Sequence, residues 1–171
     1  MLDLLNAKKL RRALLYFLCL LAALWLQLEI FSRHPLPGGA KPFFIPVLVA
    51  AVGLWEGGVW GAAFGLVAGF FCDIEMLSSV VTFLVTFAVL GFFSGLLADY
   101  FINQRFVAYL ILAALSLALT AAVQALPLWL LRDAPGSALL PVAVFQSLWS
   151  LPFAVPAYFL VRRISGKRRA E

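Results

Sequence analysis

The chain has 171 residues, of which 64% are apolar and only 12% are charged, with a formal net charge of +5. Its mean hydropathy is +1.02. A soluble domain carries roughly a quarter charged residues, so this composition excludes a water-soluble fold. Intrinsic disorder is excluded as well, because disordered segments require low hydrophobicity. The sequence therefore predicts a polytopic integral membrane protein.

The first apolar run, residues 13–31, has the roughly 20 residues that a helix needs to cross a bilayer. The run is too long for the apolar core of a signal peptide, and no small-residue cleavage pattern follows it. We therefore expect a retained first transmembrane helix, followed by a loop rich in proline and glycine. The residues that precede this helix include a basic cluster of Lys8, Lys9, Arg11 and Arg12.

The second apolar stretch, residues 42–72, is interrupted only by Glu56-Gly57-Gly58. This stretch is longer than one membrane-spanning helix requires and shorter than two such helices require. The sequence leaves two alternatives: one long broken helix, or two short helices at about 43–55 and 58–72. Beyond this stretch the sequence predicts three clear spans, at 76–98, 106–131 and 138–161.

The distribution of basic residues favours six spans over five. With six spans both termini lie in the cytoplasm, and only Arg33, Lys41 and Arg132 fall outside. With five spans the basic C-terminal tail would lie opposite the basic N-terminus, against the positive-inside rule. The predicted fold is a single all-α membrane domain, 1–171, a bundle of six transmembrane helices with both termini cytoplasmic. The cytoplasmic basic residues are then Lys8, Lys9, Arg11, Arg12, Arg105, Arg162, Arg163, Lys167, Arg168 and Arg169.

Glycines recur every fourth residue in two neighbouring spans. Residues four apart lie on one face of a helix, so each ladder forms a groove without side chains. In lipid, small residues of this kind allow helix backbones to approach closely. The ladders therefore predict tight packing of the third and fourth spans. Their members are Gly57, Gly61, Gly65 and Gly69, followed by Asp73, and Gly91 and Gly95, followed by Asp99.

The two aspartates that end the ladders are expected at opposite faces of the membrane, Asp73 near the outer face and Asp99 near the cytoplasmic one. Asp73 follows directly on apolar sequence, where an ionised carboxylate is costly unless it is paired. The sequence leaves two alternatives for it: a half-solvated interfacial charge, or a group that holds a loop or binds a partner.

The last span contains Gln146 together with Pro141, Pro152 and Pro156. Prolines remove backbone donors and kink helices, and in membranes the neighbouring helices compensate. The fifth span contains a second mid-span amide, Gln124. A hydrogen bond between Gln124 and Gln146 is the expected contact between these spans.

Residue patterns typical of catalysis do not occur in the sequence. The single histidine, His34, lies in a proline-rich loop, and no His, Cys and carboxylate cluster has metal-ligand spacing. Neither a Gly-x-Ser-x-Gly motif nor a phosphate-binding loop is found. The prediction is a non-enzymatic protein without a cofactor or a metal.

Two stretches of the chain resemble a known family. Pro46 to Asp99 contains a short apolar span, a glycine-rich turn, the motif Gly65-x-x-x-Gly69-x-x-x-Asp73 and a long following span. The closing stretch Gln146-Ser-Leu-Trp-Ser-Leu-Pro152 leads into Tyr158-Phe-Leu-Val-Arg162-Arg163. Together with the length, the number of spans and their orientation, these stretches resemble MreD, the rod-shape-determining membrane protein family of bacteria.

The resemblance implies a non-enzymatic component of the cell-elongation machinery in the bacterial inner membrane, with a role in peptidoglycan synthesis and regulation of cell shape. MreD proteins associate with MreC, a bitopic membrane protein. They work alongside MreB and the synthase RodA with its class B penicillin-binding partner. The expected partners are therefore MreC, this synthase complex and membrane lipids, and not nucleic acid.

The family's fold is similar to that of the substrate-binding S components of energy-coupling-factor transporters, which supplies an alternative function. S components dock their coupling partner through an Ala-x-x-x-Ala pattern in the first helix. The alanines of the first span here are Ala13, Ala22 and Ala23, and no two of them are four apart. The sequence therefore favours the MreD-like function over a vitamin-binding S component.

Overall fold

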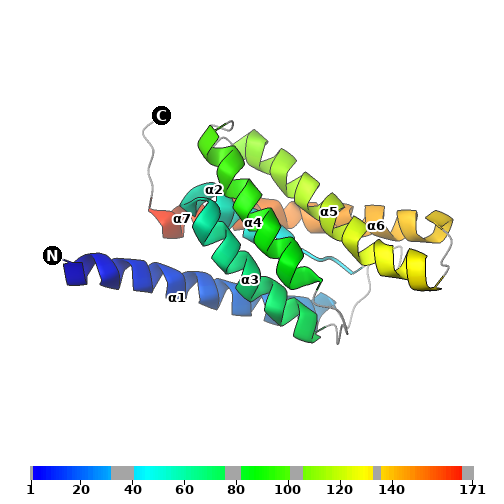
Figure 1. Cartoon of the computed structure of the whole chain (residues 1–171), viewed down its shortest axis with the longest axis horizontal. Coiled ribbons are helices and arrows are strands. Elements are labelled where there is room, and N and C mark those ends of the chain that lie inside the picture. The colour runs from blue at the N-terminus through cyan, green and yellow to red at the C-terminus, as the bar shows by residue number, and fades with distance from the viewer. Residues whose placement is uncertain (1, 32–40, 76–81, 101–105, 133–135, 167–171) are drawn as a thin grey trace.

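The computed structural model describes residues 2–31, 41–75, 82–100, 106–132 and 136–166. Within these ranges, the side chains of 2–9, 30–31, 99–100, 127, 130–132 and 136–138 are not described. The described residues form helices joined by short connections and contain no strand, so the expected all-α class is confirmed for this part of the chain (Figure 1).

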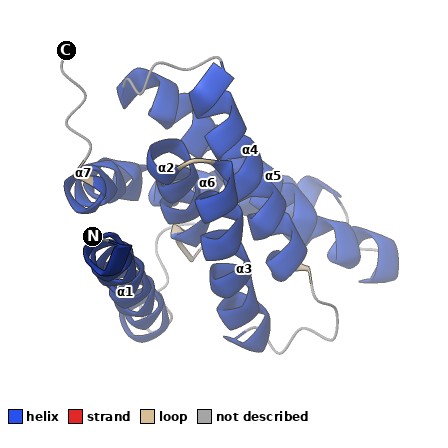
Figure 2. Cartoon of the chain, turned by 60° about the vertical axis from the view of Figure 1, so that its left-hand side comes forward, coloured by secondary structure: helices blue, strands red, loops and turns tan. Residues whose placement is uncertain are grey.

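The described residues form seven α-helices and two short helical turns. Figure 2 shows the helices from a second direction. In order they are α1 (Leu2–Leu26), the π-helical turn η1 (Gln27–Phe31), α2 (Ile45–Glu56), α3 (Gly58–Glu75), α4 (Phe83–Tyr100), α5 (Phe106–Arg132), α6 (Gly136–Ser150), the 3₁₀ turn η2 (Leu151–Phe153) and α7 (Ala154–Ser165).

Four helical stretches among the described residues are long and apolar enough to cross a membrane, judged by length and composition. The helices Ile45–Glu56 and Phe83–Ala98 are apolar but shorter. The outward faces are also apolar, since Leu14, Phe70 and Ile111 are each more than half exposed. Exposed apolar surface of this extent is typical of contact with lipid rather than water. The four long stretches are Leu10–Glu29, Gly58–Glu75, Phe106–Leu126 and Leu139–Ser165.

The helices run back and forth along the bundle, so the start of α1 and the end of α7 lie at the same end of the molecule (Figure 1). The last predicted span is not one straight helix. It consists of α6 and α7 joined by η2, which contains Pro152. Because proline lacks a backbone N–H, the regular hydrogen bonding of a helix is interrupted at this point.

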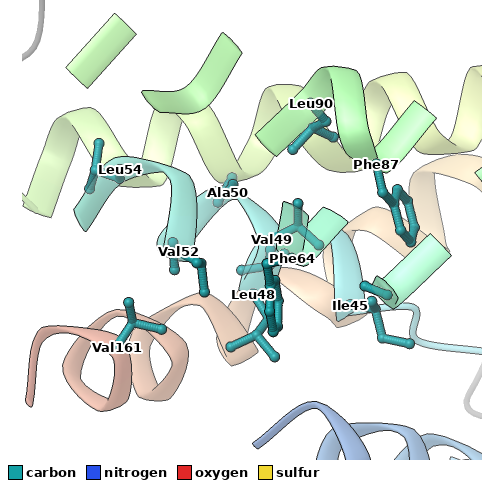
Figure 3. Packing of buried hydrophobic residues seen from close by; sticks show 14 of the residues in the cluster. Ile45, Leu48, Val49, Ala50, Val52, Leu54, Phe64, Phe87, Leu90 and Val161 are labelled. Atoms are coloured by element: carbon teal, nitrogen blue, oxygen red, sulfur yellow. The ribbon is translucent and has the colours of Figure 1, made fainter. Parts of the chain in front are cut away.

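Helix α2 lies at the centre of the bundle, in contact with α3, α4, α5 and α7 (Figure 3). Every residue from Ile45 to Trp55 is buried. A helix that is apolar on all sides is stable only where other elements surround it. With 12 residues, α2 is about 18 Å long and thus shorter than the hydrocarbon layer. It is therefore a core helix rather than a lipid-facing one.

A break at Gly57 separates α2 from α3. Gly57 has a φ of 97°, a left-handed conformation that glycine adopts without steric cost. Its N–H donates to the carbonyl of Gly53, and its own carbonyl accepts from the N–H of Gly61. Of the two alternatives for residues 42–72, the pair of short helices is correct.

Candidate functional site

The glycine ladder of α3 lies directly against the backbone of α4. A Cβ atom added at Gly61, Gly65 or Gly69 would lie less than 3.0 Å from backbone atoms of α4, a separation that real Cβ atoms essentially never show. The two helices are antiparallel and contact each other along most of their length. The contacts on α4 are Gly91 for Gly61, Phe87 for Gly65, and Phe83 and Leu84 for Gly69.

The shorter ladder on α4 completes this interface from the other side. A Cβ at Gly91 would meet the carbonyl of Gly61, and a Cβ at Gly95 would meet the backbone of Gly57 and Gly58. The two ladders therefore face each other, and the α3–α4 hairpin is held by backbone-to-backbone packing. Glycine on at least one of the two helices allows this contact: Gly61 meets Gly91, whereas Gly65 meets the backbone of Phe87.

Gly53 belongs to the same interface and was missed by the sequence analysis. It lies on α2, and a Cβ there would lie 2.5 Å from the carbonyl oxygen of Gly91 and 2.8 Å from the Cβ of Ser94. Gly53 precedes Gly57 by four residues, so extending the ladder backwards by one step would have found it. Helices α2, α3 and α4 therefore meet at Gly53, Gly61 and Gly91.

The carboxylate of Asp73 caps the N-terminus of α4. Its Oδ1 accepts hydrogen bonds from the backbone N–H groups of Thr82, at 3.3 Å, and Phe83, at 3.0 Å. Its Oδ2 accepts one from the N–H of Leu84 at 2.9 Å. These N–H groups have no partner within a helix, and the positive end of the helix dipole also favours a carboxylate there. Asp73 therefore fixes the end of α3 to the start of α4.

The capped end also shows where the fourth helix differs from the prediction. α4 begins at Phe83, whereas hydropathy predicts a span that starts at residue 76. Residues 76–81 are outside the described part of the chain, and Thr82 precedes the helix. Asp99 lies in the last turn of α4, at the opposite end of the hairpin from Asp73, and its side chain is outside the description.

Gln146 forms the expected contact between α5 and α6. Its Nε2 donates to Oε1 of Gln124 at 3.2 Å. Both side chains are half-buried, and the bond links the two helices across their shared face. Gln146 is distant in the fold from the glycine ladders, so the structure places the sequence-predicted residues in two separate regions.

Ser150, a second residue missed by the sequence analysis, holds the segment that leads into α2. Its Oγ donates to the carbonyl of Gln146 at 2.6 Å and accepts from the backbone N–H of Phe43 at 2.7 Å. Next to this bond, Phe44 stacks on Phe153 with ring centroids 4.6 Å apart. Non-helical backbone inside a bundle requires such partners, because the hydrocarbon supplies none.

An exposed apolar groove of about 700 Å³ runs between α5 and α6. On α5 its wall is formed by small residues at four-residue spacing, Ala114, Ala118 and Ala122, and all three are exposed. Ala143 and Ser147 continue the small-residue wall on α6, and leucines and Trp129 close the sides. The groove therefore has small residues at the same four-residue spacing as the ladder of α3. No helix among the described residues of this chain occupies the groove.

Among the described residues, no group of three or more His, Cys, Asp or Glu side chains is placed to hold a metal ion. Comparison of the chain with protein-family models, with curated proteins and with solved structures found no match. These comparisons therefore assign no family to the chain.

Proposed function

We propose that the protein is a non-enzymatic component of the bacterial cell-elongation machinery in the inner membrane, where it binds the bitopic protein MreC and supports peptidoglycan synthesis. The likeness of Pro46–Asp99 and of the Gln146–Arg163 stretch to MreD supports this function. The structural observation that carries the proposal is the exposed groove between α5 and α6, whose apolar lining and small residues suit contact with a transmembrane helix.

The proposal includes six passes through the membrane with both termini in the cytoplasm. The α1 start and the α7 end lie together at one end of the bundle, in agreement with an even number of passes (Figure 1). Basic residues gather towards this end, since Arg11 and Arg12 lie where the apolar stretch of α1 begins and Arg162 and Arg163 lie in the last turn of α7. The positive-inside rule then assigns that end to the cytoplasm.

The α3–α4 hairpin shows within the same chain how a stripe of small residues is used. There, positions four residues apart are covered by a neighbouring helix at backbone contact. The stripe Ala114, Ala118 and Ala122 has the same spacing and lies on an exposed face. Association of helices in lipid depends on such close packing, so the groove is a suitable place for the transmembrane helix of MreC.

Co-purification of the full chain with MreC from membranes tests the function, and variants of the groove test the location. Ala118→Leu and Ala122→Leu place side chains in the groove and are expected to reduce the recovery of MreC several-fold. Ala63→Leu is the matched control, because Ala63 is an exposed alanine on α3, a helix that does not line the groove. It should leave the recovery of MreC unchanged.

Two outcomes contradict the proposal. Absence of MreC from the purified wild-type protein, together with a bound vitamin or transporter ATPases, would assign the chain to the S components. Recovery of MreC that is unchanged in the groove variants would retain the function and exclude the groove as the docking face.

A further inference from the structure

Four arginines from the two ends of the chain gather at one end of the bundle. Arg11 and Arg12 belong to α1, Arg162 and Arg163 belong to α7, and the two helices lie next to each other there (Figure 2). One guanidinium nitrogen of Arg12 lies 3.6 Å from the Cβ position of Gly166, which ends α7. The N-terminal and C-terminal helices therefore bring their arginines to a common junction.

One arginine of each pair is in line with buried residues of its helix and has a described contact with a neighbouring helix. Arg12 precedes Tyr16 and Leu20 at four-residue steps, and those two residues form the buried face of α1. Arg162 likewise follows the buried Tyr158 by four residues, and its guanidinium carbon lies 6.0 Å from the ring centre of Trp55. Arg11 and Arg163 lie one residue away from these positions on their helices. Arg12 is half-buried, whereas Arg11, Arg162 and Arg163 are exposed.

The junction carries a surplus of positive charge. Of the acidic side chains that the structure describes, Glu56 is the one at this end, and its Oε1 accepts a hydrogen bond of 2.8 Å from the hydroxyl of Tyr16. The described side chains at this end therefore include one carboxylate and four guanidinium groups. An anion bound between Arg12 and Arg162 would reduce the mutual repulsion of these cations.

The arginines also lie at the ends of candidate membrane spans, where lipid headgroups are expected. The apolar stretches begin at Leu10 in α1 and end at Ser165 in α7, within three residues of each arginine. Exposed apolar side chains continue from both pairs towards the membrane interior: Leu14 and Leu18 on α1, and Phe159 and Leu160 on α7. A ligand with a negative head and apolar chains matches both parts of this surface.

We propose that Arg12 and Arg162 form a binding site for the phosphodiester headgroup of an anionic phospholipid, with its acyl chains along α1 and α7. The planar guanidinium group binds phosphate oxygens through paired hydrogen bonds, which gives arginine an advantage over lysine at such a site. Basic pockets between transmembrane helices bind anionic lipids by the same chemistry. This inference is independent of MreC and of the groove between α5 and α6.

Native mass spectrometry of the full chain in detergent, titrated with phosphatidylglycerol or phosphatidylcholine, measures the binding. The wild type is expected to prefer phosphatidylglycerol. Arg12→Gln with Arg162→Gln should weaken phosphatidylglycerol binding by about tenfold or more, because it removes the charge-assisted hydrogen bonds to the phosphate as well as the charge. The matched control, Arg11→Gln with Arg163→Gln, removes the same charge from the neighbouring positions but no proposed hydrogen bond to the phosphate, and it should weaken binding several-fold less than the first double variant does.

Three results would overturn the proposal: equal binding of the two lipids, equal weakening by the two double variants, or displacement of phosphatidylglycerol by an equal concentration of inorganic phosphate. Equal weakening would show diffuse attraction rather than a site. If the double glutamine variant fails to fold, Arg12→Lys with Arg162→Lys retains the charge and removes the paired geometry. That variant is then expected to bind phosphatidylglycerol more weakly than the wild type, and unchanged binding would contradict the site.

Discussion

The α3–α4 hairpin and the α5–α6 pair use small residues at the same four-residue spacing with different results. In the hairpin, glycines on both helices face each other and the backbones are in contact. Between α5 and α6, alanines line an exposed groove of about 700 Å³, and the helices are joined beside it by a hydrogen bond between Gln124 and Gln146. The spacing therefore marks a face suited to close packing, and the residue type and the surroundings decide whether the chain covers that face itself.

Substitution in the hairpin is expected to have the largest effect on stability. Gly65→Leu would place its Cβ against the backbone carbonyl of Phe87, and backbone cannot yield as a flexible side chain does. Overpacking of this kind costs at least about 1–3 kcal/mol, and two separated helices would also lose their other contacts. We expect little folded, monodisperse protein after extraction in detergent. Ala63→Leu, on the exposed face of the same helix, should behave like the wild type.

Loss of the cap at the end of the hairpin comes next. Asp73→Asn retains one acceptor oxygen but turns an amide donor towards an N–H group of α4, and it removes the charge that the helix dipole favours. We expect a loss of about 1–2 kcal/mol, measured by thermal unfolding in detergent. Asp73→Leu should cost more. A thermal midpoint of Asp73→Asn equal to that of the wild type would exclude the cap as a stabilising contact.

The sequence predicts those parts of the hairpin that depend on local periodicity. The ladder at Gly61, Gly65 and Gly69 identifies the packing face, because residues four apart share one side of a helix. It does not identify the role of Asp73, because that role depends on where α4 begins. The predicted span includes Thr82, which is not helical and directly precedes α4, so hydropathy alone does not locate the start of the helix.

Ser150 illustrates a contact that local patterns cannot reveal. Its partner, Phe43, is 107 residues away in the sequence. In the sequence, Ser150 is an ordinary small residue of an apolar span. The backbone N–H of Phe43 needs an acceptor because Phe43 enters the bundle in non-helical backbone, which the sequence does not show. Contacts of this kind are determined by the fold as a whole.

Removal of the Ser150 hydroxyl is therefore expected to destabilise the α5–α6 side of the molecule. Ser150→Ala leaves the N–H of Phe43 buried without its acceptor, at a cost of about 1–3 kcal/mol in thermal unfolding. Ser147→Ala is the matched control, since the Ser147 hydroxyl donates only to the Ala143 carbonyl of its own helix. Equal effects of the two substitutions would show that the bond to Phe43 contributes nothing.

The hydrogen bond between Gln124 and Gln146 should contribute less. Interhelical side-chain hydrogen bonds in membrane proteins average about 0.6 kcal/mol. Gln146→Leu and Gln124→Leu are each expected to lower stability slightly, and the double variant should lose less than the sum of the two. A double-mutant cycle with purely additive effects would mean that the 3.2 Å contact adds no coupling energy.

The smallest effect is expected for Ala118→Leu in the groove, and it completes the comparison with Gly65→Leu. Ala118 is exposed, so a larger apolar side chain there meets lipid rather than backbone and should change stability by less than about 0.5 kcal/mol. Leucine thus replaces one member of a small-residue stripe in each helix pair. We expect Gly65→Leu to prevent folding of the α3–α4 hairpin, and we expect the α5–α6 pair to tolerate Ala118→Leu. If Ala118→Leu also destabilises the isolated protein, the groove is part of the internal packing, and any loss of MreC in that variant reflects misfolding. If the variant is as stable as the wild type and still loses MreC, its effect is on binding alone.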